Sequence, residues 1–289
     1  AGTNYSINNV DGTLTVHVKI TLTVTADNQT ITYGDADPAS SFYTFTYGPF
    51  DGGDTSAVID TAPTCTATGP FTHAGSPYPI TCSGGVDDKY EFSYTSGSLS
   101  VDELAIAVTA DGKTKVYGAS DPALTYGNSP ALVGSDSFSG SLSRDTGENV
   151  DTYAINQGTL SLSANYILNY TSANLSITKA PLTVTANNKT KVSGTPDPAF
   201  TFDYTGFVNS ETLAVIDTPP TCGVTGAHGI PGDYPIVCLG GLDNNYAFTS
   251  YVNGTLTVTQ PAPMTLITNH INDGFIVEST ETSNVGGTV

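Results

Sequence analysis

The feature that most constrains this chain is the internal repetition of one strand-rich unit. Each unit opens and closes with a short run in which aliphatic residues alternate with small polar ones. The opening runs are Leu22–Ala26, Ile106–Ala110 and Leu182–Ala186, and the closing runs are Gly97–Val101, Ala173–Ile177 and Gly254–Val258. Successive closing leucines, from Leu14 to Leu256, are 85, 76 and 81 residues apart. Because each unit is long enough for a small domain, the repetition predicts tandem domains rather than one large core.

The pattern inside each unit is that of β-strands. Leu22, Val24 and Ala26 alternate with threonines, which indicates a half-buried strand, and clusters of Gly, Asn, Asp and Pro separate such runs. Strong helix formers are scarce, and charged residues make up only 12% of the chain. We therefore expect an all-β fold of tandem small β-domains, either Ig-like sandwiches or β-grasp-like domains, arranged as an elongated rod. One helical turn is expected over Asn209–Ala214, with Ser210 as its cap.

The repetition also predicts the domain boundaries. Repeat domains are expected at 21–102, 105–180 and 181–259, residues 1–18 as the C-terminal strands of a preceding repeat, and 260–289 as a linker and the start of a different β segment. The joints between domains are short: Asp102–Leu104 and Thr178–Pro181. Pro181 fixes its own φ angle, so we expect it to stiffen the second joint.

The charge balance excludes several classes of partner. The chain has 27 acidic and 8 basic residues, for a net charge of −19. Nucleic acids and anionic membrane surfaces are excluded, because binding them requires clustered Lys and Arg. No run of eighteen apolar residues is present, so we expect no membrane insertion in this segment. The acidity is typical of an extracellular chain kept soluble by self-repulsion, with divalent-cation binding as an alternative.

The four cysteines indicate the compartment. Cys65, Cys82, Cys222 and Cys238 occupy matching places in the first and third units, whereas Leu142 and Gln157 occupy that region of the middle unit. Gain and loss of cysteines in pairs predicts two disulfides, Cys65–Cys82 and Cys222–Cys238, rather than a metal site. By the chain-entropy estimate, each disulfide would stabilise its domain by about 3 kcal/mol. Disulfides place the protein in an oxidising, extracytoplasmic setting.

No catalytic motif is found, and we expect no enzyme activity. The sequence has no Gly-x-Ser-x-Gly elbow, no His-Glu-x-x-His pair and no phosphate-cradling loop. We expect no cofactor, with calcium bound by acidic loops as the alternative. Asp-Pro pairs recur once per unit, at Asp37, Asp121 and Asp197, and Asp35 lies two residues before the first pair. These aspartates suit either a calcium loop or a turn in which Asp bonds its own backbone. The third unit keeps Asp-Pro but loses the Asp35 pattern, which favours the turn.

Tyrosines also recur at fixed places in the units. They are Tyr33, Tyr78, Tyr117, Tyr153 and Tyr234. Two interpretations stay open at this point: packing or corner residues, and an aromatic platform for a ligand such as a glycan. The chain has no Trp, the aromatic residue that is frequent in sugar-binding faces.

The order of these motifs resembles the MBG repeat of bacterial surface proteins. The resemblance is carried by the opening run, Lys113–Gly118, Asp121-Pro122, Gly140–Arg144, Gly147–Ile155, an Asn-Tyr pair and Asn174–Ala180. Residues 105–180 match best, while 21–102 and 181–259 are similar, more divergent, and carry the cysteines. The resemblance implies large secreted adhesins or cell-surface proteins in which many tandem copies act as a stalk, without catalysis.

We therefore expect a structural stalk or filament segment of a secreted bacterial cell-surface protein, located outside the cell or on its surface. It would span distance and support adhesion or assembly. The alternative is a glycan- or mucin-binding adhesin module. Expected partners are other copies of the same chain or further repeats of the same polypeptide, with surface glycans as a second candidate. Incomplete strands at both ends are candidates for pairing with another chain by β-addition.

Overall fold

The protein is built from β-strands. The computed structural model describes residues 5–10, 13–263, 265–272 and 275–282. Regular structure in these ranges consists of strands and three short 3-10 helices, which confirms the predicted all-β fold class. None of the helices in the described ranges has the length and apolar character needed to cross a membrane. The terminal segments predicted at 1–18 and 260–289 lie partly outside the described residues.

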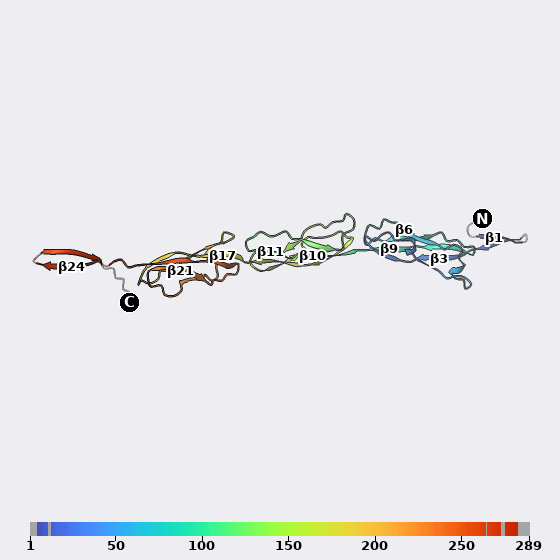
Figure 1. Ribbon diagram of the computed structural model, residues 1–289. Helices are drawn as coiled ribbons and strands as arrows, with labels where there is room; N and C mark the ends of the chain where they lie inside the picture. Colours follow the sequence, from blue (N-terminus) through green and yellow to red (C-terminus); the bar gives the residue numbers. More distant parts are fainter. Residues whose placement is uncertain (1–4, 11–12, 264, 273–274, 283–289) are drawn as a thin grey trace. The chain divides into compact units, whose positions relative to one another are not determined.

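The first repeat forms two small sheets (Figure 1). Its strands are β3 (Ile20–Ala26), β4 (Gln29–Thr32), β5 (Phe45–Tyr47), β6 (Thr64–Ala67), β7 (Tyr78–Ser83), β8 (Tyr90–Thr95) and β9 (Gly97–Asp102). One sheet has the order β5-β3-β8 and the other the order β4-β9-β7-β6. The opening strand β3 runs parallel to β8, and β4 runs parallel to β9. The 3-10 helices η1 (Ser40–Phe42) and η2 (Ser56–Val58) lie in the connections.

The core of the first repeat is shared by both sheets. Val24 of β3, Ile80 of β7 and Leu99 of β9 are all fully buried in one cluster. Alternate residues of each strand face inward, as the period of two in the sequence predicts. The two sheets therefore enclose a single core, and no α-helix is found in the part of the chain that the structure describes.

The second and third repeats have the same strand order. Repeat 2 contains β10 (Leu104–Ala110), β11 (Lys113–Val116), β12 (Tyr126–Ser129), β13 (Ser143–Arg144), β14 (Thr152–Asn156), β15 (Tyr166–Thr171) and β16 (Ala173–Thr178). Repeat 3 contains β17 (Ala180–Ala186), β18 (Lys189–Val192), β19 (Phe202–Thr205), η3 (Leu213–Val215), β20 (Thr221–Val224), β21 (Gly232–Leu239), β22 (Tyr246–Val252) and β23 (Gly254–Thr259). Their sheets are β12-β10-β15 with β11-β16-β14-β13, and β19-β17-β22 with β18-β23-β21-β20. Two antiparallel hairpins complete the described chain: β1 (Tyr5–Val10) with β2 (Thr13–Val18), and β24 (Thr265–Asn272) with β25 (Phe275–Thr282).

The chain divides into two compact units that do not coincide with the repeats. The first consists of 1–112, 123–145 and 154–174, and the second of 113–122, 146–153 and 175–289. The first unit holds repeat 1 together with strands β10, β12 and β15 of repeat 2. The second holds β11 of repeat 2 together with repeat 3. Each unit therefore contains one boundary between consecutive repeats.

The joints between repeats are shorter than the sequence indicates. Strand β9 is separated from β10 by Glu103 alone, and β16 from β17 by Lys179 alone. The prediction of Pro181 as part of a linker is wrong, because Pro181 is the second residue of β17. A proline is tolerated there because β19 pairs with β17 only from Thr183 onward, so no strand on that side needs its missing N–H.

The predicted helical turn is also displaced. It lies at Leu213–Val215, after Thr212, and is a 3-10 turn instead of a Ser210-capped helix over Asn209–Ala214. Asn209 and Ser210 have φ angles of 54° and 60°, in the left-handed region that a right-handed helix cannot include. The backbone N–H of Glu211 donates to the carbonyl of Val208 and closes a tight turn at this point.

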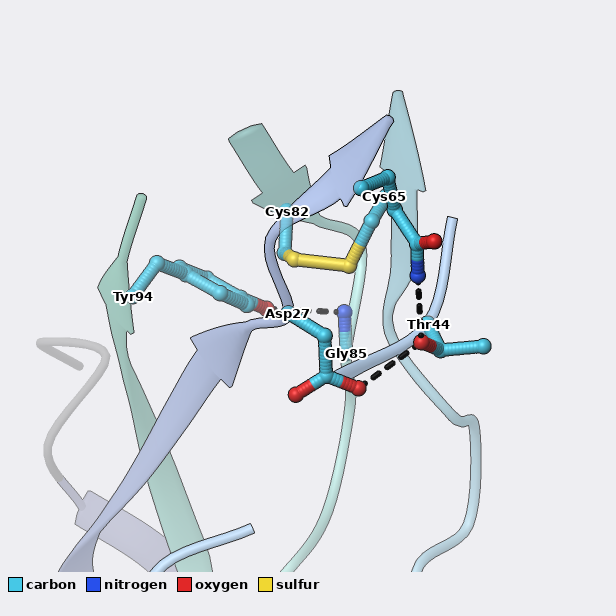
Figure 2. Close-up of a disulfide and its surroundings, with 7 residues drawn as sticks. Asp27, Thr44, Cys65, Cys82, Gly85 and Tyr94 are labelled. Atoms are coloured by element: carbon cyan, nitrogen blue, oxygen red, sulfur yellow. Dashed lines mark hydrogen bonds between the residues drawn. A yellow bond between two sulfur atoms is a disulfide. The ribbon is translucent and has the colours of Figure 1, made fainter. Parts of the chain in front are cut away.

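Two disulfides each join an edge strand to its neighbour, with the predicted pairing. Cys65 of β6 lies directly opposite Cys82 of β7, and Cys222 of β20 lies opposite Cys238 of β21. Figure 2 shows the first bridge, close to the hydrogen bond that Thr44 donates to Asp27. The edge strands β6 and β20 have no further neighbour in their sheets, so each bridge anchors the strand that is otherwise held on one side only.

We expect reduction to destabilise repeats 1 and 3 and to leave repeat 2 unchanged. The bridges close loops with sequence separations of 17 and 16 residues, which corresponds to about 3 kcal/mol each by the chain-entropy estimate. Denaturant unfolding of the Cys65→Ser/Cys82→Ser variant, followed by hydrogen exchange of each repeat, measures the loss. Equal loss of protection in the core of repeat 2, around Ile106 and Val108, would contradict this local role.

Candidate functional site: the junctions between repeats

The first junction is built around two tyrosines and one carboxylate. Tyr33 follows β4 of repeat 1, and its ring packs edge to face against Tyr166 of repeat 2, with centroids 5.3 Å apart. Both hydroxyls donate to Oδ2 of Asp136, Tyr33 at 2.9 Å and Tyr166 at 2.7 Å. The Tyr166 hydroxyl also accepts from the backbone N–H of Val133 at 2.9 Å. One residue of repeat 1 thereby completes a hydrogen-bond network of repeat 2.

The second junction repeats this arrangement with a glutamate. Tyr117 of repeat 2 packs edge to face on Tyr246 of repeat 3, with centroids 5.6 Å apart. Their hydroxyls donate to the two oxygens of Glu211, at 2.6 Å from Tyr117 and 2.5 Å from Tyr246. Val208 donates its backbone N–H to the Tyr246 hydroxyl at 3.0 Å. Tyr117 and Tyr246 are both buried in one apolar cluster with Ile177 of repeat 2 and Leu182 of repeat 3.

A glycine follows the tyrosine at each junction, and both its conformation and its size are required. Gly34 and Gly118 have φ angles of 90° and 80°, which side-chain-bearing residues rarely adopt. A Cβ atom on Gly34 would lie 2.5 Å from a methyl carbon of Val133, and one on Gly118 would lie 2.4 Å from a methyl carbon of Val208. The glycine therefore allows the valine of the next repeat to pack directly against the backbone.

An asparagine side chain bonds the backbone of the preceding repeat at each junction. Oδ1 of Asn165 accepts from the backbone N–H of Ala74, and Oδ1 of Asn245 accepts from that of Val150, both at 2.9 Å. Each asparagine directly precedes the tyrosine of its own repeat. These bonds fix the preceding repeat at a second point beside the tyrosine contact.

We name the two sides of this joint by their residues. The plug is the Tyr-Gly pair, Tyr33-Gly34 in repeat 1 and Tyr117-Gly118 in repeat 2. The socket is the set of four residues in the following repeat, Val133, Asp136, Asn165 and Tyr166 in repeat 2 and Val208, Glu211, Asn245 and Tyr246 in repeat 3. A plug seated in its socket is called a latch.

Electrostatics favour the neutral tyrosines in both latches and the ionised form of Asp136 in the first. Burial, together with the hydrogen bond to Asp136, raises the pKa of Tyr166 to about 12. Burial and the bond to Glu211 raise the pKa of Tyr246 to about 12 as well. Hydrogen bonds from Tyr166 and Tyr33 lower the pKa of Asp136. At neutral pH the hydroxyls of Tyr33 and Tyr166 therefore remain donors to the ionised Asp136, which is the stronger kind of hydrogen bond.

The sequence identified half of each latch. Tyr33 and Tyr117 are among the predicted recurrent tyrosines, and the structure places them in the junctions. The other three support their own repeats: Tyr153 donates to the carbonyl of Asn149, Tyr234 donates to that of Ile230, and Tyr78 packs on Phe71 with centroids 5.0 Å apart. The sockets were missed. Their signals were the Asn-Tyr pair and the Val-x-x-acid spacing of Val133 with Asp136 and Val208 with Glu211.

Asp35 forms a turn, and the Asp-Pro aspartates Asp121 and Asp197 form ion pairs. Asp35 accepts the backbone N–H of Thr32 at 2.8 Å, as the turn interpretation predicts. Asp121 lies 2.6 Å from the ammonium of Lys115, and Asp197 lies 2.7 Å from that of Lys191. Within the described ranges, no three His, Cys, Asp or Glu side chains form a group suited to a metal ion. Asp35 therefore makes the backbone contact that the turn interpretation predicts, whereas Asp121 and Asp197 bind lysine side chains.

Lys115 is a buried cation whose charge is kept by two acids. Its side chain is 4% exposed, and its ammonium lies 2.5 Å from Glu148 as well as close to Asp121. Burial by itself lowers the pKa of Lys115, but the two carboxylates raise it more, so the net shift is upward. The group is therefore an ammonium that ties β11 to the loop before β14, and not a nucleophilic amine.

Comparison with known proteins gives a family model and a distant structure. The model described as the MBG domain (YGX type) matches residues 22–100, 106–176 and 182–257. No curated protein sequence matches. Among solved structures, the chain is similar to Drosophila N-cadherin EC1-3, with 9% identity over 81% of this chain and 98% of that chain, at a TM-score of 0.24. A likeness that weak carries no argument about fold or function.

The latches are expected to open in alkali. Because the folded-state pKa of Tyr166 and of Tyr246 is raised to about 12 from 10.0, their stabilising effect is complete below about pH 10 and is lost as the pH rises through about 12. A tyrosinate beside the carboxylate of Asp136 also repels it. Tyrosinate absorbance during a pH titration measures the transition. In Asp136→Asn the titration steps of Tyr166 and Tyr33, whose pKa values the bond to Asp136 helps to raise, should both shift downward, and an unchanged titration curve would contradict the assignment.

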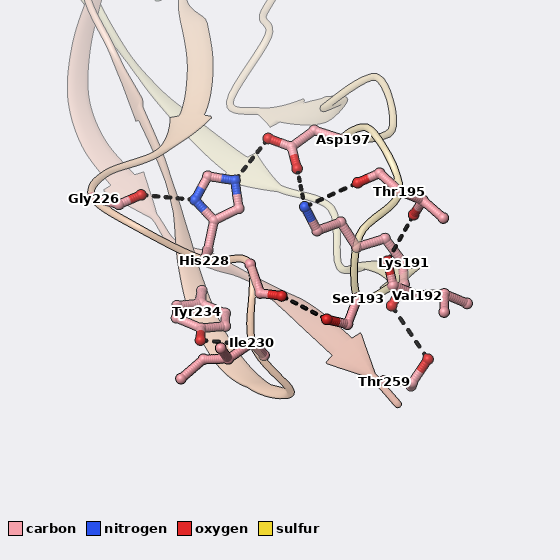
Figure 3. A network of polar contacts seen from close by, with 11 residues as sticks. Lys191, Val192, Ser193, Thr195, Asp197, Gly226, His228, Ile230, Tyr234 and Thr259 are labelled. Atoms are coloured by element: carbon pink, nitrogen blue, oxygen red, sulfur yellow. Dashed lines mark hydrogen bonds and ion pairs between the residues drawn. The ribbon is translucent and has the colours of Figure 1, made fainter. Parts of the chain in front are cut away.

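A second pH effect is expected at His228 in repeat 3. Its Nδ1 bonds the carbonyl of Gly226 and its Nε2 bonds Asp197, both at 2.8 Å (Figure 3). Both partners are acceptors, so the doubly protonated ring fits, and the Asp197 contact raises the pKa of His228. The stabilisation is therefore complete below about pH 6.5 and is lost as the pH rises through the raised pKa. NMR titration measures the pKa of His228. The pH dependence of the stability of repeat 3 should be abolished in His228→Gln and kept in the control variant His73→Gln.

Proposed function

Because the chain belongs to the MBG domain family of the YGX type, with three tandem domains, we propose that it is a structural stalk segment of a secreted bacterial surface protein. The disulfides and the family favour an extracellular protein. In this role the repeats span distance and transmit force between whatever lies before and after them. We propose no catalytic reaction for this segment.

The observation that carries the proposal is the pair of latches. Both are built from the same residue types, a plug tyrosine against a socket tyrosine and a shared carboxylate. Relative movement of two latched repeats requires an aromatic ring to leave its packing and two hydroxyls to lose an ionised acceptor. A flexible tether would be longer and free of such contacts, whereas here one residue separates the strands of neighbouring repeats. Resistance to bending is the property that a stalk requires.

The alternative, a glycan-binding module, has one supporting feature in repeat 1. Phe92 and Tyr94 are stacked with centroids 6.3 Å apart, and they line a shallow hollow of about 390 Å³ with Lys19 and Glu91. An aromatic pair beside charged side chains suits a sugar ring. Repeat 2 has Leu168 at the position of Phe92, so the pair does not recur in each repeat. Recurrence would be expected if binding were the purpose of the array.

The stalk proposal predicts a specific loss of stiffness. In Tyr33→Phe/Tyr117→Phe both plug hydroxyls are lost, and the ratio of closed to open junctions should fall about tenfold at each, the size of one hydrogen bond to an ionised group. The distribution of distances between spin labels on neighbouring repeats, measured by pulsed EPR, should become broader. Tyr234→Phe is the matched control, because its hydroxyl bonds within its own repeat.

Two results would count against the proposal. One is a distance distribution that stays narrow in the double variant, which would show that the latches do not limit bending. The other is specific binding of the parent chain on a glycan array that is lost in Tyr94→Ala. That pattern would favour the adhesin alternative.

A further inference from the structure

The parts of the latch are distributed unequally over the three repeats. Repeat 2 has both a plug and a socket, and both are engaged. Repeat 1 has a plug, but its socket is altered. Repeat 3 has a socket, but Ser193-Gly194 stands at the position of its plug. The strands on both sides of these positions have the same order in all three repeats, so the positions correspond directly.

The altered socket of repeat 1 keeps its framework. The Tyr90 hydroxyl donates to Oδ2 of Asp54 at 2.9 Å and accepts from the backbone N–H of Asp51 at 3.0 Å. These bonds repeat those that Tyr166 makes with Asp136 and with the backbone of Val133. Tyr90 is buried like the other socket tyrosines. The difference therefore lies in the side chains that would meet a plug, and not in the fold.

Two of those side chains have become charged in repeat 1. Asp51 stands where the sockets have Val133 and Val208, and Lys89 stands where they have Asn165 and Asn245. The Lys89 ammonium lies 2.8 Å from Asp54 and 3.3 Å from Asp51, and 5.4 Å from the centre of the Tyr90 ring. The lysine thus bonds the carboxylate that a plug tyrosine would use.

Seating a plug on this surface would be unfavourable. In the two formed latches, a glycine packs on the valine and a tyrosine hydroxyl reaches the acid. Here the same approach would remove the side chains of Asp51 and Lys89 from water and displace the lysine from Asp54. Burial of charged groups without full compensation costs more than the contacts return.

Repeat 3 lacks the other half of the latch. The backbone N–H of Ser193 donates to the carbonyl of Thr259, as that of Tyr33 donates to Asp102 and that of Tyr117 to Thr178, all at 2.8 Å. The side chain differs: Oγ of Ser193 donates to the carbonyl of Gly229 at 2.6 Å, within repeat 3 (Figure 3). The backbone of the plug is kept, while the aromatic ring and the hydroxyl that would reach a socket are gone.

We propose that Asp51 and Lys89 close the socket of repeat 1 to any Tyr-Gly plug, and that Ser193 leaves repeat 3 without one, so that a second copy of this chain is not accepted end to end. The side chains at these positions then limit latched contacts to the two junctions between the three repeats. The inference rests on the geometry of the junctions and not on the stalk function, since a binding module with Asp51, Lys89 and Ser193 at these positions would be closed in the same way.

The first test restores both halves in one chain. The variant Asp51→Val/Lys89→Asn/Ser193→Tyr should associate head to tail, with a sedimentation coefficient that rises with concentration beyond any rise in the parent. Two partial variants are the controls: Asp51→Val/Lys89→Asn restores only the socket, and Ser193→Tyr restores only the plug. Each of them should sediment like the parent. A triple variant that also sediments like the parent at every concentration would overturn the proposal.

The second test transfers the closure to a working junction. The variant Val208→Asp/Asn245→Lys gives repeat 3 the side chains of repeat 1, where the same pair is accommodated in a folded domain. It should release Tyr117, so that the pKa of this tyrosine, which the Glu211 bond and burial now raise, moves down toward 10.0. NMR of ¹³C-labelled tyrosine, assigned with Tyr117→Phe, measures the shift. An unchanged Tyr117 titration in the folded variant would show that the charged pair does not close a socket.

Discussion

The structure depends on the need of a buried tyrosine hydroxyl for an acceptor. Tyr166 and Tyr246 are largely excluded from water, and each donates to an acid of its own repeat. That acid has capacity for a second donor, and the tyrosine of the preceding repeat supplies it. The requirement that stabilises one domain therefore also creates the contact to the next. Glycine at the following position permits the close approach without which the ring could not reach the acid.

Latches and disulfides complement each other along the array. Repeats 1 and 3 each take part in one latch and carry one disulfide, whereas repeat 2 takes part in both latches and has none. In repeat 2, strand β13 pairs with β14 from Ser143 opposite Asn156, so the next facing pair is Leu142 and Gln157. These two residues stand at the positions that the cysteines occupy in repeats 1 and 3. Leu142 packs into an apolar cluster that also includes Tyr33 of repeat 1. Small β-domains bury little apolar area, so each needs a further source of stability, from a covalent bridge or from its neighbours.

Much of the fold could be predicted because its causes are local. Alternation of Leu22, Val24 and Ala26 with threonines requires a strand with one buried face. Cysteines that are present or absent as a pair from one repeat to the next indicate a disulfide. The predictions that failed concerned conformations set by a few torsions. Asn209 and Ser210 adopt left-handed φ angles that their residue types do not require, and Pro181 lies in a strand because the neighbouring strand starts later.

The sequence by itself determined the repeated unit, its strands, the cysteine pairs and the plugs, because each of these recurs as a short contiguous motif whose physical consequence is local. Only the tertiary structure decided the sockets and therefore the role of the plugs. Asp136 is 103 residues from Tyr33, and Glu211 is 94 residues from Tyr117. The pairing of Lys89 with Asp51 and Asp54 likewise joins positions brought together only by folding. A contact between distant residues depends on the path of the backbone between them, which no single motif specifies.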